Sequence, residues 1–343
     1  MHHPHNFFRF ATRELSHSAF WAWVLQAVDR SAPEFDGPKE LGERLLETLD
    51  APSSPSSIKV ETERPLPANA GRADIWAEVG HTHVVVIENK MSAVPSPSQI
   101  ERYQDALARE SRILRLCLLS TAFDEEVRAE FELDPECHFM SAENVLSMFD
   151  GVTQDHPLLR DYHEWLSGVL ARRERNRRWV FSSNDEELVE ALATREGQWE
   201  LLKELTESMT GRQYRGTNRG GRPWTQYRFV EEGEDGPDAM FYRIDQSSRG
   251  YYLSVRQYQA TPQPDWAAKK ARRKLLRSVW KEAVAETQAD LAFERPRNWG
   301  RKESEIAWLL FRRNPVATVI EQIPKIHEEF LYRLGINPPP QDG

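Results

Sequence analysis

Three ionisable side chains within one short stretch of the sequence have the types and spacing that chemistry requires. The stretch RADIWAEVGHTHVVVIENK (residues 72–90) is typical of two strands joined by a turn around His81. Because side chains alternate along a strand, Glu88 and Lys90 project from the same face. A hairpin that is symmetric about His81 places Asp74 opposite Glu88. We therefore expect two carboxylates and one ammonium group to meet at the end of this hairpin.

Paired carboxylates at this position suit a hard divalent cation. Residues Val84 to Ile87 are all apolar, and burying carboxylates beside them costs on the order of several kcal/mol unless the acids are paired or bound to metal. Mg²⁺ binds carboxylate oxygens, keeps waters and accepts phosphate oxygens, and Mn²⁺ can take its place. Such an ion activates water for phosphodiester hydrolysis, while Lys90 offsets transition-state charge. Zinc is disfavoured, because no set of His or Cys residues accompanies the acids.

The same residues have a structural alternative. Glu88 and Lys90 would then be ordinary residues that leave a buried strand, and Asp74 would form a salt bridge near the turn. The triplet across one hairpin with an aliphatic centre favours the functional interpretation. His81 and His83 resemble a pair of metal ligands, but they fall in the turn, away from the acids. We expect both histidines to be exposed to solvent.

The segments around this hairpin predict a layered α/β domain over residues 1–180. The run Val84 to Ile87 is typical of a strand that helices cover on both faces. Ser96 suits a helix N-cap, and Pro97 suits the first helical position. We predict a central mixed sheet flanked by helices. Its elements are helices over 12–28, near 39–49, from about residue 96 and over 156–176, and further strands over 58–66 and 112–120.

Residues 181–343 predict a second, mixed α/β region. Their periodicity changes from helical to alternating and back to helical. We expect this accessory domain to bind nucleic acid or a protein partner. Its predicted elements are a helix beginning near residue 182, a flexible basic loop over 211–223, strands at 224–230, 239–245 and 251–259, and two or three helices interrupted at Pro315 and Pro324.

The composition excludes several classes of protein. The chain has 343 residues, of which 39% are hydrophobic and 29% charged, typical of a soluble protein of about two domains. No apolar run approaches the ~20 residues of a membrane span, and no secretion-signal pattern is present. A cytoplasmic location without membrane contact is expected. Cys117 and Cys137 lack a CxxC pattern, which argues against a disulfide framework and a structural zinc site.

The net charge of −9 ordinarily counts against a nucleic-acid partner, but the basic residues are clustered. Such clusters are compatible with one positive face, although a solvated helix flank is their more common origin. Trp224, Tyr227 and Trp299 would stack on bases only if they are not core residues. The clusters are RRERNRR at 172–178, the arginines from Arg212 to Arg228, and KKARRKLLR at 269–277.

Two further motifs flank the hairpin. Gln99 and Tyr103 form a Q-x3-Y pair on the predicted following helix, and Glu14 lies on the first helix. Together with D-x13-E-x-K across the hairpin, they make residues 6–120 resemble the PD-(D/E)xK nuclease superfamily, and more closely its RecB-like branch. Ala73 stands where the family usually has Pro, which leaves the acidic ligand intact.

The resemblance implies a restriction-endonuclease-like core and a role for each matched residue. Asp74, Glu88, the backbone carbonyl of Asn89 and, through water or at a second ion, Glu14 would bind metal. Gln99 would contact substrate or Lys90, and Tyr103 would contact phosphate. The structural alternatives are a helix cap for Gln99, a core position for Tyr103 and a helix-dipole contact for Glu14. Glu61 and Glu63, on the preceding strand, are weaker candidates.

Two classes of function follow from this resemblance. The first is a Mg²⁺-dependent deoxyribonuclease that acts in defence against foreign DNA. Such an enzyme would work as a homodimer or with an ATPase or helicase subunit. The second is a catalytically silent module of the same fold that binds nucleic acid or a protein. RNA cleavage is a third alternative. DNA cleavage with Mg²⁺ or Mn²⁺, with EDTA and with Lys90→Ala separates the first two, and a parallel RNA lane separates the third.

Overall fold

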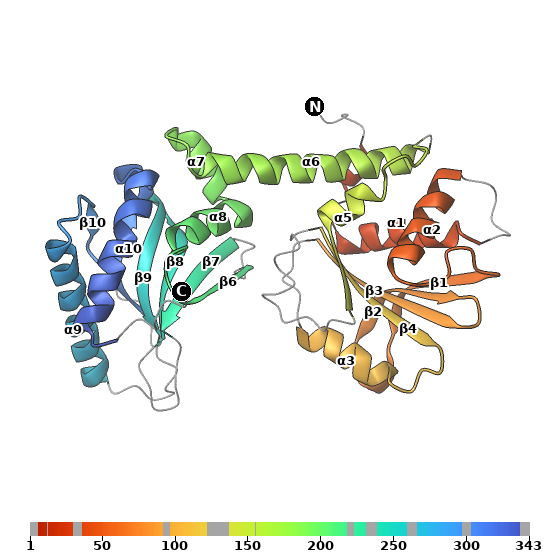
Figure 1. Cartoon of the computed structure of the whole chain (residues 1–343), viewed down its shortest axis with the longest axis horizontal. Coiled ribbons are helices and arrows are strands. Elements are labelled where there is room, and N and C mark those ends of the chain that lie inside the picture. Colours follow the sequence, from red (N-terminus) through yellow and green to blue (C-terminus); the bar gives the residue numbers. More distant parts are fainter. Residues whose placement is uncertain are drawn as a thin grey trace. The chain divides into compact units, whose positions relative to one another are not determined.

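The chain folds into two compact units, Met1–Arg172 and Arg173–Gly343. The computed structural model describes residues 6–11, 13–29, 36–91, 97–121, 137–154, 156–217, 223–230, 239–258, 266–296 and 303–336. The boundary between the units falls inside helix α6 (Pro157–Trp179), and the sequence places it at the end of the same helix (Figure 1).

The first unit is built on a five-stranded mixed sheet in the order β1-β2-β3-β4-β5. The first three strands are antiparallel neighbours, whereas β3, β4 and β5 run parallel. This confirms the predicted mixed sheet. The strands are β1 (Ile58–Pro65), β2 (Arg72–Val79), β3 (His83–Lys90), β4 (Ile113–Ser120) and β5 (Cys137–Ser141).

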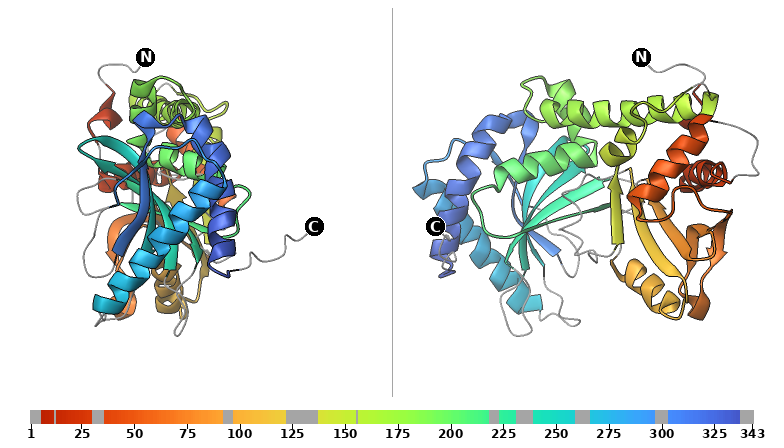
Figure 2. Two further views of the ribbon diagram at one scale, coloured as in Figure 1. Left: turned by 90° about the vertical axis from the view of Figure 1, so that its left-hand side faces the viewer. Right: turned by 45° about the vertical axis from the view of Figure 1, so that its right-hand side comes forward.

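Helices cover both faces of this sheet. Alternating residues of β3 supply both cores: Val85 and Ile87 pack with α1, α2, α5 and α6, while Val84 and Val86 pack with α3. The right-hand view of Figure 2 shows α3 on the opposite side of the sheet from α1 and α2. The helices are α1 (Glu14–Gln26), α2 (Asp36–Thr48), α3 (Pro97–Leu107), α5 (Ala142–Ser147) and the short 3-10 segments η1 (Phe7–Arg9) and η2 (Pro67–Asn69).

The β2–β3 hairpin has the register that symmetry about His81 predicts. Ile75 faces Ile87 and Val79 faces His83. Asp74 therefore lies one residue beyond the last paired position of β2, at the end of the hairpin opposite to the turn.

Two elements of the first unit were missed from the sequence. Strand β5 has five residues, and α5, which follows it directly, has six. Elements this short contain too few residues to display a period. Helix α3 begins at Pro97, but the expected cap, Ser96, lies outside the described residues.

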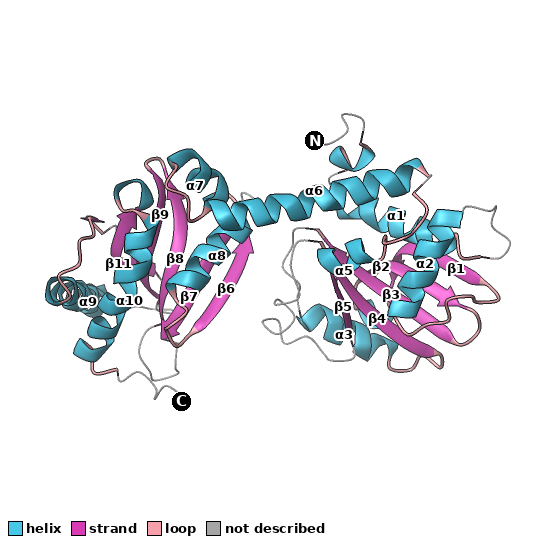
Figure 3. Cartoon of the chain, turned by 45° about the horizontal axis from the view of Figure 1, so that its top comes forward, coloured by secondary structure: helices cyan, strands magenta, loops and turns pink. Residues whose placement is uncertain are grey.

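The second unit contains an antiparallel sheet in the order β10-β11-β9-β8-β7-β6. One core joins one face of this sheet to its helices, and Figure 3 shows α8, α9 and α10 beside the strands. The strands are β6 (Arg212–Thr217), β7 (Pro223–Val230), β8 (Ala239–Ser247), β9 (Gly250–Tyr258), β10 (Phe293–Glu294) and β11 (Glu303–Leu310). The helices are α7 (Asp185–Leu192), α8 (Arg195–Leu205), α9 (Trp266–Glu286), α10 (Val316–Arg333) and the 3-10 segment η3 (Phe311–Arg313).

Three predictions for this second unit were wrong. Residues 212–217, expected in a flexible loop, form β6, because backbone pairing with β7 organises a segment that has no apolar pattern. Strands β10 and β11 occupy a region where only helices were expected. Pro324 does not interrupt α10, since Ile323, Ile326 and Phe330 around it are fully buried and hold the helix together.

The first basic cluster is largely neutralised by acids. Arg175 lies 2.9 Å from Glu190, and the neighbouring arginines of α6 form similar ion pairs with α8. This cluster is therefore a charge-compensated helix flank. The other pairs are Arg173 with Glu196 at 3.8 Å and Arg177 with Glu200 at 3.7 Å.

The described residues contain neither a membrane-spanning helix nor a disulfide bond. None of their helices is long and apolar enough to cross a membrane. Cys117 and Cys137 are both buried and free, as expected for packing residues.

Close packing of α1 against α2 gives the first prediction. A Cβ atom at Gly42 would lie 2.5 Å from the carbonyl oxygen of Val24 and 2.6 Å from Val28 Cγ2. Gly42→Ala should lower the free energy of unfolding by about 1–3 kcal/mol because the helices must separate. Urea unfolding measures this loss. The control Glu47→Ala, on the exposed face of α2, should change stability by no more than about 0.5 kcal/mol, and equal effects would contradict the close approach.

Candidate active site

Asp74 closes the end of the β2–β3 hairpin. Its Oδ2 accepts a hydrogen bond of 2.7 Å from the backbone N–H of Asn89, just beyond the last ladder pair. Burial and the nearby charge of Glu88 raise the pKa of Asp74 to about 7, although the Asn89 N–H group and Lys90 oppose the shift. A carboxylate in this state is poorly compensated by the protein, and a cation would favour its ionised form.

Glu88 is the most heavily bonded side chain of the site. It is 3% exposed, and three side chains donate to its carboxylate. Lys90 Nζ and Gln99 Nε2 donate to Oε1, the latter at 2.6 Å, while the Tyr103 hydroxyl lies 2.9 Å from Oε2. The buried charge is thus stabilised by one cation and two neutral donors.

Lys90 projects from the same face as Glu88, as strand alternation predicts, and its side chain is 14% exposed. Burial acts to lower the pKa of Lys90, but the hydrogen bond to Glu88 and the charges of Glu88, Glu14 and Asp74 outweigh it and raise the pKa overall. Lys90 therefore stays protonated at neutral pH and acts as a cation.

Gln99 and Tyr103 lie one turn apart on α3 and face Glu88. Gln99 Nε2 also donates to the Tyr103 hydroxyl at 2.9 Å, and that hydroxyl lies within hydrogen-bond distance of the Arg72 carbonyl oxygen. Tyr103 is 1% exposed, and burial raises the pKa of its hydroxyl. Both residues therefore hold the Glu88 carboxylate in place. A hydrogen bond between Gln99 and Lys90 is not among the described interactions, and the contact of Tyr103 with phosphate stays a prediction.

Glu14 joins the first helix to the end of β3. Its Oε1 accepts a hydrogen bond of 3.1 Å from the N–H of Met91. Its carbonyl oxygen accepts from Asn89 Nδ2, also at 3.1 Å, and the same amide donates to Ser18 Oγ at 3.2 Å. The side chain of Asn89 thus points to α1, while its main chain contacts Asp74.

The oxygen donors fit a hard divalent ion better than a softer one. No group of three His, Cys, Asp or Glu side chains in the described part of the chain forms a complete metal-binding cluster. Asp74 and Glu88 would therefore supply two carboxylate ligands to an ion that keeps several waters, as Mg²⁺ does. Asn89 could add its backbone carbonyl, and Glu14 a contact through water.

The remaining acids and histidines occupy different positions. Glu61 forms an ion pair of 2.6 Å with Lys59. Glu63 lies on β1 between the residues that pair with Ile75 and Ala73, and its φ is positive, at 53°. Its negative charge also helps to raise the pKa of Asp74. His81 and His83 are at the turn, far along the hairpin from Asp74.

One contact of the site was missed from the sequence. Ser18 links α1 to Asn89, and it also donates to the Glu14 carbonyl oxygen at 3.0 Å. Ser18 lies four residues after Glu14 and therefore on the same face of the helix, and this spacing could have indicated its contact with the site.

The raised pKa of Asp74 gives a prediction about pH and stability. Its carboxyl ionises near pH 7 when folded and near pH 4 when unfolded, so the metal-free protein loses stability as pH rises between these values. Asp74→Asn should remove this loss. Its free energy of unfolding should exceed that of the wild type by up to about 4 kcal/mol at pH 8, and by little at pH 4. Urea unfolding in EDTA measures the difference.

The control for this experiment is Asp105→Asn, on the exposed face of α3. It should match the wild type at both pH values. Added Mg²⁺ should raise the melting temperature of the wild type and of Asp105→Asn, but not that of Asp74→Asn. A pH-independent difference between Asp74→Asn and the wild type would contradict the assigned environment.

The contact between Tyr103 and Glu88 gives a third prediction. Tyr103→Phe keeps the buried ring but removes a donor from Glu88, so the free energy of unfolding should fall by about 1–3 kcal/mol. Mg²⁺ should also raise the melting temperature less than in the wild type. Tyr162→Phe is the matched control, since Tyr162 accepts a 3.0 Å hydrogen bond from Trp21 elsewhere in the core. It should lose stability but keep the full response to Mg²⁺, and identical responses would refute the positioning role.

A comparison with known proteins identifies the family of the first unit. The model of the PD-(D/E)XK nuclease superfamily matches residues 5–182, which include every residue of the site. No curated protein and no solved structure matches the chain. The match covers more than half of the sequence, well beyond the expected residues 6–120, and the chain therefore belongs to the PD-(D/E)XK nuclease superfamily.

Proposed function

We propose that this protein is a metal-dependent nuclease that hydrolyses phosphodiester bonds of DNA with Mg²⁺, for which Mn²⁺ can substitute. The observation that carries the proposal is the meeting of Asp74, Glu88 and Lys90 at one end of the β2–β3 hairpin. Three ionisable groups that are costly to bury share this position, in a member of a nuclease superfamily.

The acids are assigned to metal binding. Asp74 and Glu88 provide side-chain oxygens, Asn89 its backbone carbonyl, and Glu14 a contact through water or at a second ion. When bound, the ion supplies a water of lowered pKa and stabilises charge on the phosphoryl group. Gln99 and Tyr103 fix the orientation of Glu88, so the ligand does not need to be reorganised when substrate arrives.

Lys90 is assigned an electrostatic role. Its raised pKa keeps the ammonium group charged, so it cannot remove a proton from water. It instead orients the attacking water and stabilises negative charge on the phosphoryl oxygens. The half-buried position strengthens this interaction relative to a lysine in solvent.

A silent module with the same fold is the second candidate. Such a module would have no need of a buried Glu88 held by three donors beside a poorly compensated Asp74. We therefore favour the enzyme. We further propose that the substrate is DNA and that the protein belongs to the RecB-like branch of the superfamily. In this proposal it acts in defence against foreign DNA, as a homodimer or with an ATPase or helicase subunit.

A cleavage assay tests the proposed function. The wild type should cut DNA with Mg²⁺ or Mn²⁺, and EDTA should abolish cutting. Lys90→Ala should reduce the rate about 100-fold or more, because a preorganised cation is lost. The control Lys59→Ala removes an exposed lysine of β1 and should retain the wild-type rate.

Several DNA forms and an RNA substrate should be compared in the same assay. Intact nucleic acid in every lane, with binding retained, would support the silent module. Cleavage of RNA alone would overturn DNA as the substrate. Cleavage by Lys90→Ala at the wild-type rate would refute the role of Lys90.

A further inference from the structure

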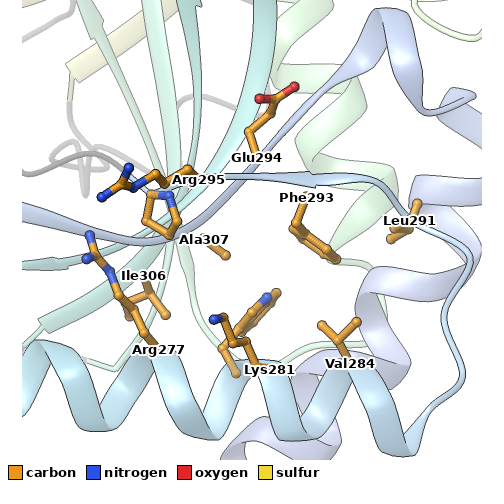
Figure 4. Close-up of a pocket in the computed structure, with 11 residues that line it drawn as sticks. Arg277, Lys281, Val284, Leu291, Phe293, Glu294, Arg295, Ile306 and Ala307 are labelled. Atoms are coloured by element: carbon orange, nitrogen blue, oxygen red, sulfur yellow. The ribbon is translucent and has the colours of Figure 1, made fainter.

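The second unit contains a pocket of about 420 Å³ between α9 and the segment that holds β10 and β11 (Figure 4). This volume lies within the range of small-ligand sites. All the residues that line it belong to one unit, and none of them takes part in the candidate active site.

One end of the pocket is apolar and aromatic. Figure 4 shows Phe293, Val284 and Leu291 together at this end. Trp280 closes this end from the core side: it is 2% exposed, and its ring centroid lies 6.0 Å from that of Phe293 at an interplanar angle of 83°. These surfaces suit a flat, weakly polar group.

The opposite end is cationic, and Figure 4 shows Arg277 and Arg295 on this side. Arg277 Nε and Nη2 donate to the Glu305 carbonyl oxygen at 3.0 and 2.8 Å, which fixes the guanidinium group. Burial and the charges of Arg273 and Arg295 lower the pKa of Arg277, although the charge of Glu305 opposes the shift. These like charges repel one another, so an anion between them would stabilise this end of the pocket.

One lining residue is acidic, but its charge is compensated. Glu294 forms ion pairs of 2.9 Å with Arg249 and with Arg313, neither of which lines the pocket. The carboxylate therefore does not cancel the positive charge of Arg277, Lys281 and Arg295.

A stripe of basic residues leads along α9 to this pocket. Each member lies three or four positions from another member, so all of them share one face of the helix. The stripe extends from Lys270 to Lys281, a rise of about 16 Å along the helix, which is long enough to follow several phosphates of a strand. Its members are Lys270, Arg273, Lys274, Arg277 and Lys281.

We propose that this pocket binds one nucleotide, with the base against Phe293 and the phosphate beside Arg277 and Arg295. The basic stripe of α9 then follows the neighbouring phosphates of the same strand. A nucleotide combines a flat ring with an anion, which matches the two ends of the pocket. The inference rests on the proposed function, since it makes the second unit a contact for the DNA substrate. A free mononucleotide has the same chemistry, and the experiment separates the two sources.

Binding measured in EDTA tests the pocket without turnover. A short single-stranded DNA should bind the full chain with salt-dependent affinity. Val284→Phe fills the apolar end and should weaken binding about tenfold or more with an unchanged salt dependence. Lys281→Gln should weaken binding and reduce the slope of log affinity against log salt concentration by about one, as for a lost phosphate contact.

Two matched variants control for volume and charge. Val189→Phe adds the same volume at an exposed position of α7, and Lys325→Gln removes an exposed lysine of α10. Both should bind as the wild type does, and thermal unfolding should show that all four variants are folded. Wild-type affinity in Val284→Phe and Lys281→Gln would overturn the proposal.

Titration with single deoxynucleotides separates the two ligand sources. If they bind as tightly as the strand, and Val284→Phe weakens both equally, the pocket serves a free nucleotide and the strand contact is refuted. Cleavage with Mg²⁺ keeps the two proposals distinct. If the wild type cuts DNA but Val284→Phe binds DNA normally, only the proposal for the pocket is overturned. If binding depends on the pocket but no DNA is cut, only the proposed nuclease activity is overturned.

Discussion

A buried carboxylate at the end of β3 is the constraint on which the first unit depends. Glu88 is 3% exposed, and an ion in that position is costly unless donors surround it. The donors come from β3 itself and from α3, so the helix must dock in one orientation for the charge to be satisfied. The docking of α3 on the sheet therefore also supplies two of the three donors to Glu88.

Much of this arrangement could be predicted from the sequence because it follows from local periodicity. The aliphatic run in β3 predicted helices on both faces of the sheet, and symmetry about His81 predicted the pairing of the hairpin. Alternation along β3 placed Glu88 and Lys90 together. Short elements such as β5, and strands without an apolar pattern such as β6, depend on their neighbours and were not predicted.

The contacts within the site were harder to predict than its members. The sequence indicated Gln99 and Tyr103, but not that both would bond to Glu88, since this depends on how α3 crosses the sheet. Likewise, Asp74 was placed opposite Glu88, yet its carboxylate turns to the N–H of Asn89, where the ladder ends. The hydrogen-bond partner of such a side chain depends on which backbone N–H groups the strand ladder leaves available, and residue types alone do not indicate these groups.

The hydrogen bonds around Asn89 have a consequence for the life of the chain. They join α1, near the amino terminus, to β2 and β3, and Glu88 extends the connection to α3. Parts separated by almost ninety positions must all be in place before the two acids and the lysine adopt their arrangement. A nascent or partly unfolded polypeptide therefore has no assembled centre, and the site exists only once the first unit has folded as a whole.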